Sequence, residues 1–197
     1  MSSQPPSRVL YVIVCGAGPA SAVGRLIEQA HARGWDAHVI ATPAALDFLD
    51  VDALEALAGH PVRSTYAKPG AGRGRSLPHA DAIVVAPATY NTINKWALGI
   101  SDTYALGILA EAPGLGIPVV VLPFVNAALS ANPAFQRSVN SLRAIGVRVV
   151  LGPREWEPHP PGTGGSRIDT FPWNVTLDQV EELLNSRNRS SSDRPSS

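Results

Sequence analysis

Five apolar runs of strand length alternate with segments of helical periodicity along this sequence. The first run, Arg8 to Cys15, is rich in β-branched residues and lacks polar alternation, which is typical of a strand buried on both faces of a sheet. Alternating strands and helices predict a parallel sheet that helices cover on both faces. The predicted strands are 8–15, 36–42, 80–86, 118–123 and 148–151, and the predicted helices are 21–33, 43–58, 89–110, 133–145 and 176–185.

One domain accounts for the length and composition of the chain. It has 197 residues, of which 45% are hydrophobic, and this is enough for a single core. We expect a flexible N-terminus at 1–7 and one domain at 8–185. A disordered tail is expected at 186–197, where serine, arginine, aspartate and proline leave nothing to bury. Thr176 is the predicted N-cap of the last helix.

Charge and hydropathy exclude several classes of partner. Lys and Arg total 16, as do Asp and Glu, so the net charge attracts neither nucleic acid nor an anionic membrane. The longest apolar runs are too short to span a bilayer, and the N-terminus lacks the apolar core of a secretory signal. Cys15 is the only cysteine, so no internal disulfide forms. We expect a cytoplasmic protein, and the richness in Arg, Ala, Gly and Pro is typical of a GC-rich bacterial genome.

Ligands of open parallel sheets bind beyond the carboxyl ends of the strands. The segments that follow the first four predicted strands are therefore candidate sites, and the first contains Gly16-Ala-Gly-Pro-Ala-Ser21. Glycines between a strand and a helix allow backbone N–H groups to approach a phosphate. The spacing to Gly24 does not fit the dinucleotide pattern, so a mononucleotide phosphate and an ordinary tight turn remain the alternatives.

The segment after the third strand is more specific, because capping alone would explain only one or two of its polar side chains. Pro87-Ala-Thr-Tyr-Asn-Thr-Ile-Asn-Lys95, followed by Gly99-Ile-Ser-Asp102, resembles the flavin-contacting motif of the homo-oligomeric flavin-containing cysteine decarboxylases. These include phosphopantothenoylcysteine decarboxylase-like and lantibiotic cysteine decarboxylase-like enzymes. The resemblance covers roughly residues 8–150. It implies an α/β, flavodoxin-like or Rossmann-like three-layer sandwich with a parallel sheet.

The resemblance also implies FMN as cofactor and a homotrimer, or a multiple of trimers, with flavin at the subunit interface. Trp96 and Tyr104 either line that interface or pack in the core. The family oxidises the carbon next to a thiol and then releases carbon dioxide, so the implied substrate is a small molecule or a peptide. No metal is expected. The residues that fall where the family contacts FMN are Gly16, Ser21, Thr42, Ala45, Pro87, Thr89, Asn91 and Thr92.

Departures from the family pattern concern the catalytic positions. The family's histidine before the third strand is replaced by Arg73, while His79 and His60 are displaced from it. In the substrate motif, Asn126 is kept but both methionines and the tryptophan are lost. Asn126 either holds a substrate carboxylate or caps a turn.

Residues 154–173 correspond to the family's flap over the substrate, or form a linker. In the first case, His159 and Arg167 would meet an anionic ligand, so Arg167 and Asn126 are the candidate substrate-binding residues. Two functions remain open: an FMN-dependent decarboxylase-like lyase and a non-catalytic flavin-binding accessory or regulatory protein. A prenyltransferase is a third alternative. For a lyase, the candidate catalytic residues are Asn126, His79 and Arg73.

Overall fold

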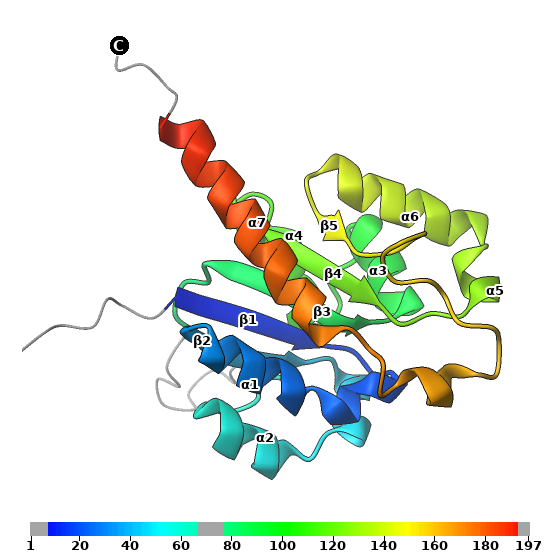
Figure 1. Ribbon diagram of the computed structural model, residues 1–197, viewed down its shortest axis with the longest axis horizontal. Coiled ribbons are helices and arrows are strands. Elements are labelled where there is room, and N and C mark those ends of the chain that lie inside the picture. Colours follow the sequence, from blue (N-terminus) through cyan, green and yellow to red (C-terminus); the bar gives the residue numbers. More distant parts are fainter. Residues whose placement is uncertain (1–7, 67–76, 193–197) are drawn as a thin grey trace, which may run out of the picture.

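The computed structural model describes residues 8–66 and 77–192 (Figure 1), so the expected flexible N-terminus at 1–7 lies outside the described residues. Its strands form one parallel sheet of order β2-β1-β3-β4-β5, which confirms the predicted α/β flavodoxin-like fold. The strands are β1 (Arg8–Val14), β2 (Trp35–Ala41), β3 (Ala82–Ala88), β4 (Val119–Pro123) and β5 (Arg148–Val149).

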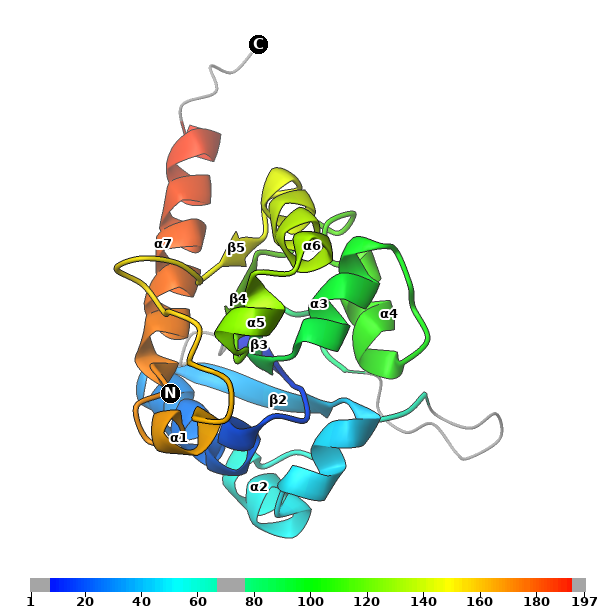
Figure 2. The same cartoon turned by 90° about the vertical axis from the view of Figure 1, so that its right-hand side faces the viewer.

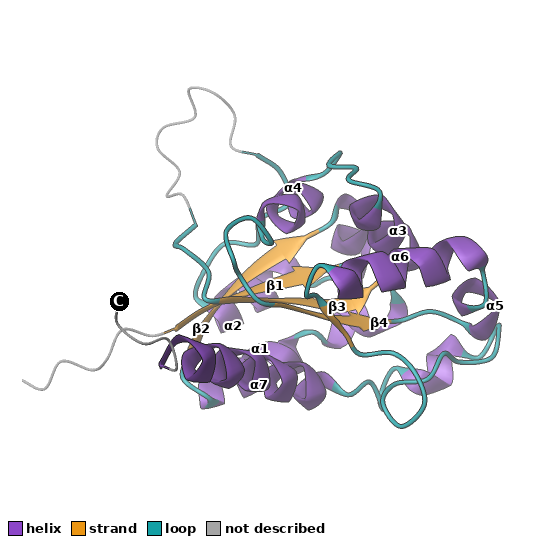
Figure 3. Cartoon of the chain, turned by 90° about the horizontal axis from the view of Figure 1, so that it is seen from above, coloured by secondary structure: helices purple, strands orange, loops and turns teal. Residues whose placement is uncertain are grey.

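Helices cover both faces of the sheet (Figure 3), and the sheet separates two clusters of buried side chains, one on each face. One face carries α1 (Gly24–Ala32), α2 (Val51–Ala58) and α7 (Trp173–Ser192). The other carries α3 (Tyr90–Ala97), α4 (Tyr104–Glu111) and α6 (Pro133–Ala144), while α5 (Ala127–Ser130) is a single turn before α6. Among the described helices, none is both long and apolar enough to cross a membrane.

The predicted helix 89–110 is two helices in the structure. Gly99 adopts a left-handed φ of 72°, which ends α3. Thr103 then caps α4 by accepting a hydrogen bond from the Leu106 N–H at 3.2 Å. The predicted helix 43–58 is likewise divided into a 3₁₀ helix, Pro43–Phe48, and α2, because Asp50 caps α2 through the Ala53 N–H.

The first predicted helix, 21–33, also begins differently, with a 3₁₀ helix at Gly18–Ala22 that precedes α1. At the other end of the chain, α7 begins at Trp173, so Thr176 lies within its first turn and is not its N-cap. The Thr176 hydroxyl donates to the Trp173 carbonyl at 2.7 Å. The helix continues to Ser192 because elongation of a formed helix needs no new nucleation. Residues 186–192, which were expected to begin the disordered tail, therefore belong to this helix, and 193–197 lie outside the described residues.

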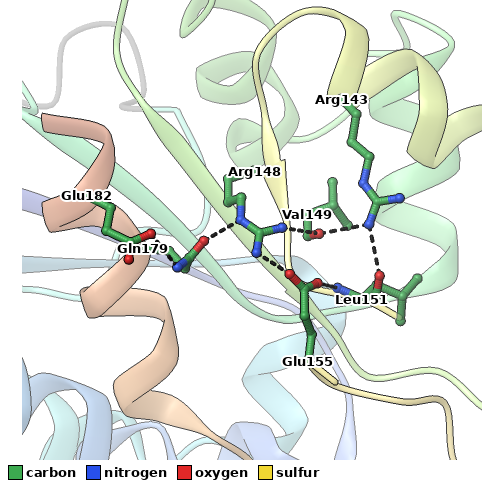
Figure 4. Close-up of polar contacts among 7 residues, drawn as sticks. All are labelled: Arg143, Arg148, Val149, Leu151, Glu155, Gln179 and Glu182. Atoms are coloured by element: carbon green, nitrogen blue, oxygen red, sulfur yellow. Dashed lines mark hydrogen bonds and ion pairs between the residues drawn. The ribbon is translucent and has the colours of Figure 1, made fainter. Parts of the chain in front are cut away.

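Arg148 ties the edge strand β5 to two other parts of the chain (Figure 4). Its guanidinium donates to Gln179 of α7 and to Glu155, which lies in the segment after β5. Glu155 in turn accepts from the Leu151 N–H at 3.0 Å, and Arg143 of α6 donates to the carbonyls of Val149 and Leu151. These contacts fix the point at which the segment 154–172 leaves the sheet.

Candidate functional site

A cavity of 540 Å³ lies where the first four strands end, and Figure 2 shows this end of the sheet toward the viewer. Its volume is within the range of about 300–1,000 Å³ that is typical of small-molecule and cofactor sites. It lies at the carboxyl ends of β1 and β3, where the strand order reverses, which is the ligand-binding position of this topology. It is lined by Gly16, Ala17, Thr42, Pro43, Ala44, Thr89, Tyr90, Asn91, Thr92, Lys95, Thr103, Leu106, Phe124 and Leu129.

Gly16 brings the first two loops of the cavity into contact. A Cβ added at this position would lie 2.6 Å from the Ala44 carbonyl oxygen, which is closer than such atoms approach in proteins. The chain therefore needs glycine here for the backbone after β1 to lie against the backbone after β2. The backbone of this loop is left exposed to the cavity, as a phosphate site requires.

The segment after β3 supplies the polar wall of the cavity. Thr89 is the N-cap of α3, and its hydroxyl oxygen accepts from the Thr92 N–H at 3.3 Å. The two threonine hydroxyls are 3.0 Å apart, and Asn91 lies between them in the sequence and also lines the cavity. The positive end of the α3 dipole is thus directed at a wall of hydroxyl and amide groups, which suits an anionic ligand.

Lys95 is the one cationic side chain among the described residues that line the cavity. Its ammonium group donates to the Asp102 carboxylate at 2.5 Å. Lys95 lies in the last turn of α3 and Asp102 lies just before the N-cap of α4, so the ion pair fixes the direction of the Lys95 side chain. Within the predicted motif, Thr89 to Thr92 and Lys95 therefore line the cavity, and Asp102 holds the Lys95 side chain.

Cys15 lies behind this wall and is 1% exposed. Burial raises the pKa of the Cys15 thiol, against hydrogen bonds with Thr92 and Thr89 that lower it. The thiol is therefore protonated near neutral pH and is a poor nucleophile. The backbone N–H of Cys15 donates to the Pro87 carbonyl at 3.1 Å, and this hydrogen bond joins the ends of β1 and β3.

The cavity brings together five of the eight residues predicted to bind the cofactor: Gly16, Thr42, Thr89, Asn91 and Thr92. The other three are not among its lining residues. Ser21 is exposed and its hydroxyl donates to the Gly18 carbonyl, whereas Ala45 is fully buried beneath the second loop. Pro87 lies behind the wall, where it pairs with Cys15.

The sequence reasoning missed two lining residues, Thr103 and Leu106, whereas Phe124 and Leu129 lie in the candidate segment that follows the fourth predicted strand. Thr103 and Leu106 belong to α4, which the sequence merged with α3 into one helix. A local signal for Thr103 exists, because threonine is a good N-cap. No periodicity or motif marks Leu106, since its position depends on how α4 packs in the fold.

The segment 154–172 is attached to the end of β4 beside the cavity. Asn126 and His159 form an isolated parallel β-bridge, and the Ala127 N–H donates to the His159 carbonyl at 2.8 Å. The Phe124 ring, which lines the cavity, contacts the His159 ring with their centroids 4.9 Å apart. This places the predicted flap next to the cavity, although its movement remains a prediction.

The two predicted substrate-binding residues are engaged within the chain. The Asn126 side-chain oxygen caps α5 by accepting from the Leu129 N–H at 2.9 Å. The Arg167 guanidinium lies 4.2 Å from the centroid of the Trp156 ring and donates to the Glu157 carbonyl. Neither residue lines the cavity, so their contact with substrate remains a prediction.

Phe171 is expected to anchor the flap segment. It is 3% exposed, and its ring makes edge contacts with Phe124, Trp156 and Trp173. Replacing it with alanine leaves a cavity among these rings, so we expect Phe171→Ala to lower the free energy of unfolding by about 3–5 kcal/mol. Denaturant titration measures this loss. The control is Phe48→Ala, whose ring is 43% exposed, and equal losses in the two variants would contradict the anchoring role.

The histidine candidates lie away from the cavity. His79 is exposed, and it precedes β3, at the end of that strand opposite to the cavity. His60 follows α2 and contacts Asp36 of β2. Arg73 lies outside the described residues. Within one chain, neither of the two candidates, His79 and His60, reaches the cavity.

The structure defines an α/β protein with a cofactor-sized cavity at the switch point of a flavodoxin-like sheet. The Flavoprotein family matches residues 2–165, and the chain belongs to this family. Similar solved structures include the FMN-dependent cysteine decarboxylase SpaF, with 28% identity, 89% of this chain and 98% of that chain covered, and a TM-score of 0.64. The FMN-dependent cysteine decarboxylase TvaF from thioviridamide biosynthesis is 26% identical, with 88% of this chain and 98% of that chain covered, and its TM-score is 0.67.

Curated relatives point the same way. The coenzyme A biosynthesis bifunctional protein CoaBC of Escherichia coli K12 is 30% identical over 144 residues, which cover 71% of this chain and 34% of that protein. The chain thus spans about a third of this relative. A probable phosphopantothenoylcysteine decarboxylase of Streptococcus mutans is 26% identical, with 73% of this chain and 82% of that protein covered. The predicted family is confirmed, and FMN is supported as its cofactor.

Proposed function

We propose that this chain binds FMN in the cavity and acts as a decarboxylase-like lyase on a small or peptidyl substrate that carries a thiol and a carboxylate. The observation that carries the proposal is the cavity at the β1/β3 switch point, with a glycine contact on one side and the Thr89–Lys95 wall on the other. FMN, when bound, supplies an acceptor for the electron pair of the thiol-bearing carbon. The chain itself supplies binding and orientation.

The roles of the wall residues follow from their chemistry. The loop at Gly16 and the N-terminus of α3 offer backbone N–H groups to a phosphate. Thr42, Asn91 and Thr92 offer hydroxyl and amide groups to the polar edge of a ring. Lys95 adds a positive charge that Asp102 partly balances. This set suits a mononucleotide that carries one phosphate.

Asn126 can serve both of the roles left open for it. Its side-chain oxygen caps α5, and the nitrogen of the same amide carries two donors that suit a carboxylate. Asn126 lies two residues after Phe124 of the cavity and pairs with His159 of the flap segment. We propose that it orients the substrate carboxylate at the boundary between cavity and flap.

A second function is favoured by the ionisable groups around the cavity. Its described lining holds no carboxylate and no imidazole, and Tyr90 and Lys95 are its ionisable side chains. A general base is therefore lacking from this part of the chain. This favours the alternative of a flavin-binding accessory or regulatory protein, because Arg73 cannot act as a base.

Purified protein is expected to be yellow and to release FMN, not FAD, on denaturation, as chromatography of the released flavin will show. Asn91→Leu replaces an amide of the polar wall with an apolar group, and we expect it to lose most of the flavin while its circular dichroism is unchanged. The control is Asn140→Leu on the exposed face of α6. A colourless native protein that takes up no added FMN would contradict the proposal.

We also propose a homotrimer or a multiple of it. Apolar side chains stay exposed in the turn that follows α3: Leu98 is 74% and Ile100 41% exposed. Trp96 is 6% exposed and packs in the core, so it is not available to an interface. Light scattering on the same preparation gives the mass of the assembly.

A further inference from the structure

A cluster of metal-ligating side chains lies at the edge of the sheet, outside the flavin cavity. Asp36 and His38 are two residues apart on β2 and therefore project from the same face. His60 reaches them from the segment after α2. Its Nε2 lies 2.6 Å from Asp36 Oδ1, and His38 Nε2 lies 3.3 Å from Asp36 Oδ2. One ligand atom from each of the three residues lies within 4.8 Å of the other two.

The backbone holds the three residues together. Gly59, with a φ of 73°, ends α2 and turns the chain back toward β2. Arg63 then pairs with β2, because its N–H donates to the Val39 carbonyl at 3.0 Å and its carbonyl accepts from the Ala41 N–H at 2.7 Å. His60 is thus delivered to the sheet edge by main-chain pairing, and not by its own contact with Asp36.

The spacing suits a tetrahedral ion. Zinc bonds to nitrogen and oxygen of about 2.0–2.2 Å place tetrahedral ligands about 3.3–3.6 Å apart. The separation of 3.3 Å between His38 Nε2 and Asp36 Oδ2 has this value, whereas His60 Nε2 contacts the other carboxylate oxygen, Oδ1. Binding of one ion requires His60 Nε2 to give up its hydrogen bond with Oδ1 and to turn toward the ion. The His60 side chain is 34% exposed, so it has room to move, and its ring now stacks on His38 with their centroids 3.9 Å apart.

The surroundings keep the ligands in the forms that bind metal. Burial lowers the pKa of His38, as do the charges of His60 and Arg63, while Asp36 opposes them. The pKa of Asp36 is also below its ordinary value: burial raises it, but the hydrogen bond from His60 and the charges of both histidines outweigh this. The Tyr11 ring lies edge-on to the His38 ring, with their centroids 6.3 Å apart, and covers the inner side of the cluster.

We propose that Asp36, His38 and His60 bind a divalent transition-metal ion, with Zn²⁺ as the best match, and that water completes the coordination. Two imidazoles and one carboxylate suit Zn²⁺, whereas Mg²⁺ and Ca²⁺ prefer oxygen ligands alone. The site is about 13 Å along β2 from Thr42 of the cavity, since His38 precedes Thr42 by four residues. The ion fastens the segment after α2 to the sheet edge. No metal site was expected from the sequence, because Asp36 and His60 are 24 residues apart.

Zinc titration of the untagged full-length protein, after dialysis against EDTA, tests this site. We expect calorimetry to show one Zn²⁺ per chain, a rise in melting temperature with added Zn²⁺, and little response to Mg²⁺. Cobalt is expected to give the visible absorption of a tetrahedral site. His60→Ala removes a ligand that lies outside β2 and should weaken Zn²⁺ binding by at least about 10- to 100-fold, the range seen even when only a partner of a ligand is lost.

The matched control is His31→Ala, which removes an exposed histidine on α1 and should leave Zn²⁺ binding unchanged. Circular dichroism checks that both variants are folded. If the native protein and His60→Ala bind Zn²⁺ equally, or neither binds it, the proposal is wrong and the cluster is a hydrogen-bonded His–Asp–His group alone. FMN content is measured separately, so failure of the zinc site does not bear on the flavin site.

Discussion

Gly16→Val is expected to lose FMN binding while the fold persists. The added side chain would lie against the Ala44 carbonyl, since even a Cβ would be 2.6 Å from its oxygen. Without ligand, the two loops can separate and relieve the clash, but binding needs both at their present positions. Overpacking of this kind costs about 1–3 kcal/mol, which corresponds to a loss of about 5- to 150-fold in affinity.

Titration of apo-protein with FMN, followed by flavin fluorescence, measures this loss. Gly114→Ala is the matched control, because its Cβ would lie 3.5 Å from the Glu111 carbonyl, an ordinary contact, and Gly114 is not among the cavity residues. Circular dichroism should be the same for all three proteins. Native affinity in Gly16→Val would show that the contact between the first two loops does not position the cofactor.

Decarboxylation by the native chain is expected to be slow or absent, and Arg73→His is expected to raise it. Arg73 stands where the resembling family has histidine, and a guanidinium stays protonated near neutral pH and cannot act as a base. Proton transfer by a positioned side chain contributes about 10²- to 10⁴-fold to a rate, which sets the size of the expected gain. Single-turnover carbon dioxide release from phosphopantothenoylcysteine and from cysteine-ended peptides measures it.

Arg137→His, on the exposed face of α6, controls for the addition of a histidine elsewhere. A gain that is confined to Arg73→His would support an intact flavin site that lacks its base. Rapid release by the native chain would show instead that the role assigned to position 73 is wrong. No release by either protein would favour the accessory or regulatory function.

The sequence alone was sufficient for the strands and for the polar edge of the cavity. An uninterrupted apolar run such as 8–15 has one stable environment, the interior of a parallel sheet, so strand positions are nearly local information. The same holds for Thr89, Asn91 and Thr92, which follow a strand end directly and therefore lie at the ligand-binding edge of the sheet.

Helix boundaries were harder to predict from the sequence, because single residues decide them. Gly99 and Thr103 separate α3 from α4, with six residues between the two helices. The last helix runs to Ser192 through a sequence rich in serine, arginine and asparagine. In both places the outcome depends on a cap or on elongation, which composition does not report.

Only the tertiary structure decided which distant residues meet. The contact between Gly16 and Ala44, the position of Phe124 between cavity and flap, and the approach of His60 to Asp36 each join segments that the sequence separates. Strand periodicity fixes which face a side chain occupies, but the distance between two side chains depends on sheet order, loop path and helix packing. For that reason the flavin wall was predictable from a motif, whereas the proposed metal site became visible only in the fold.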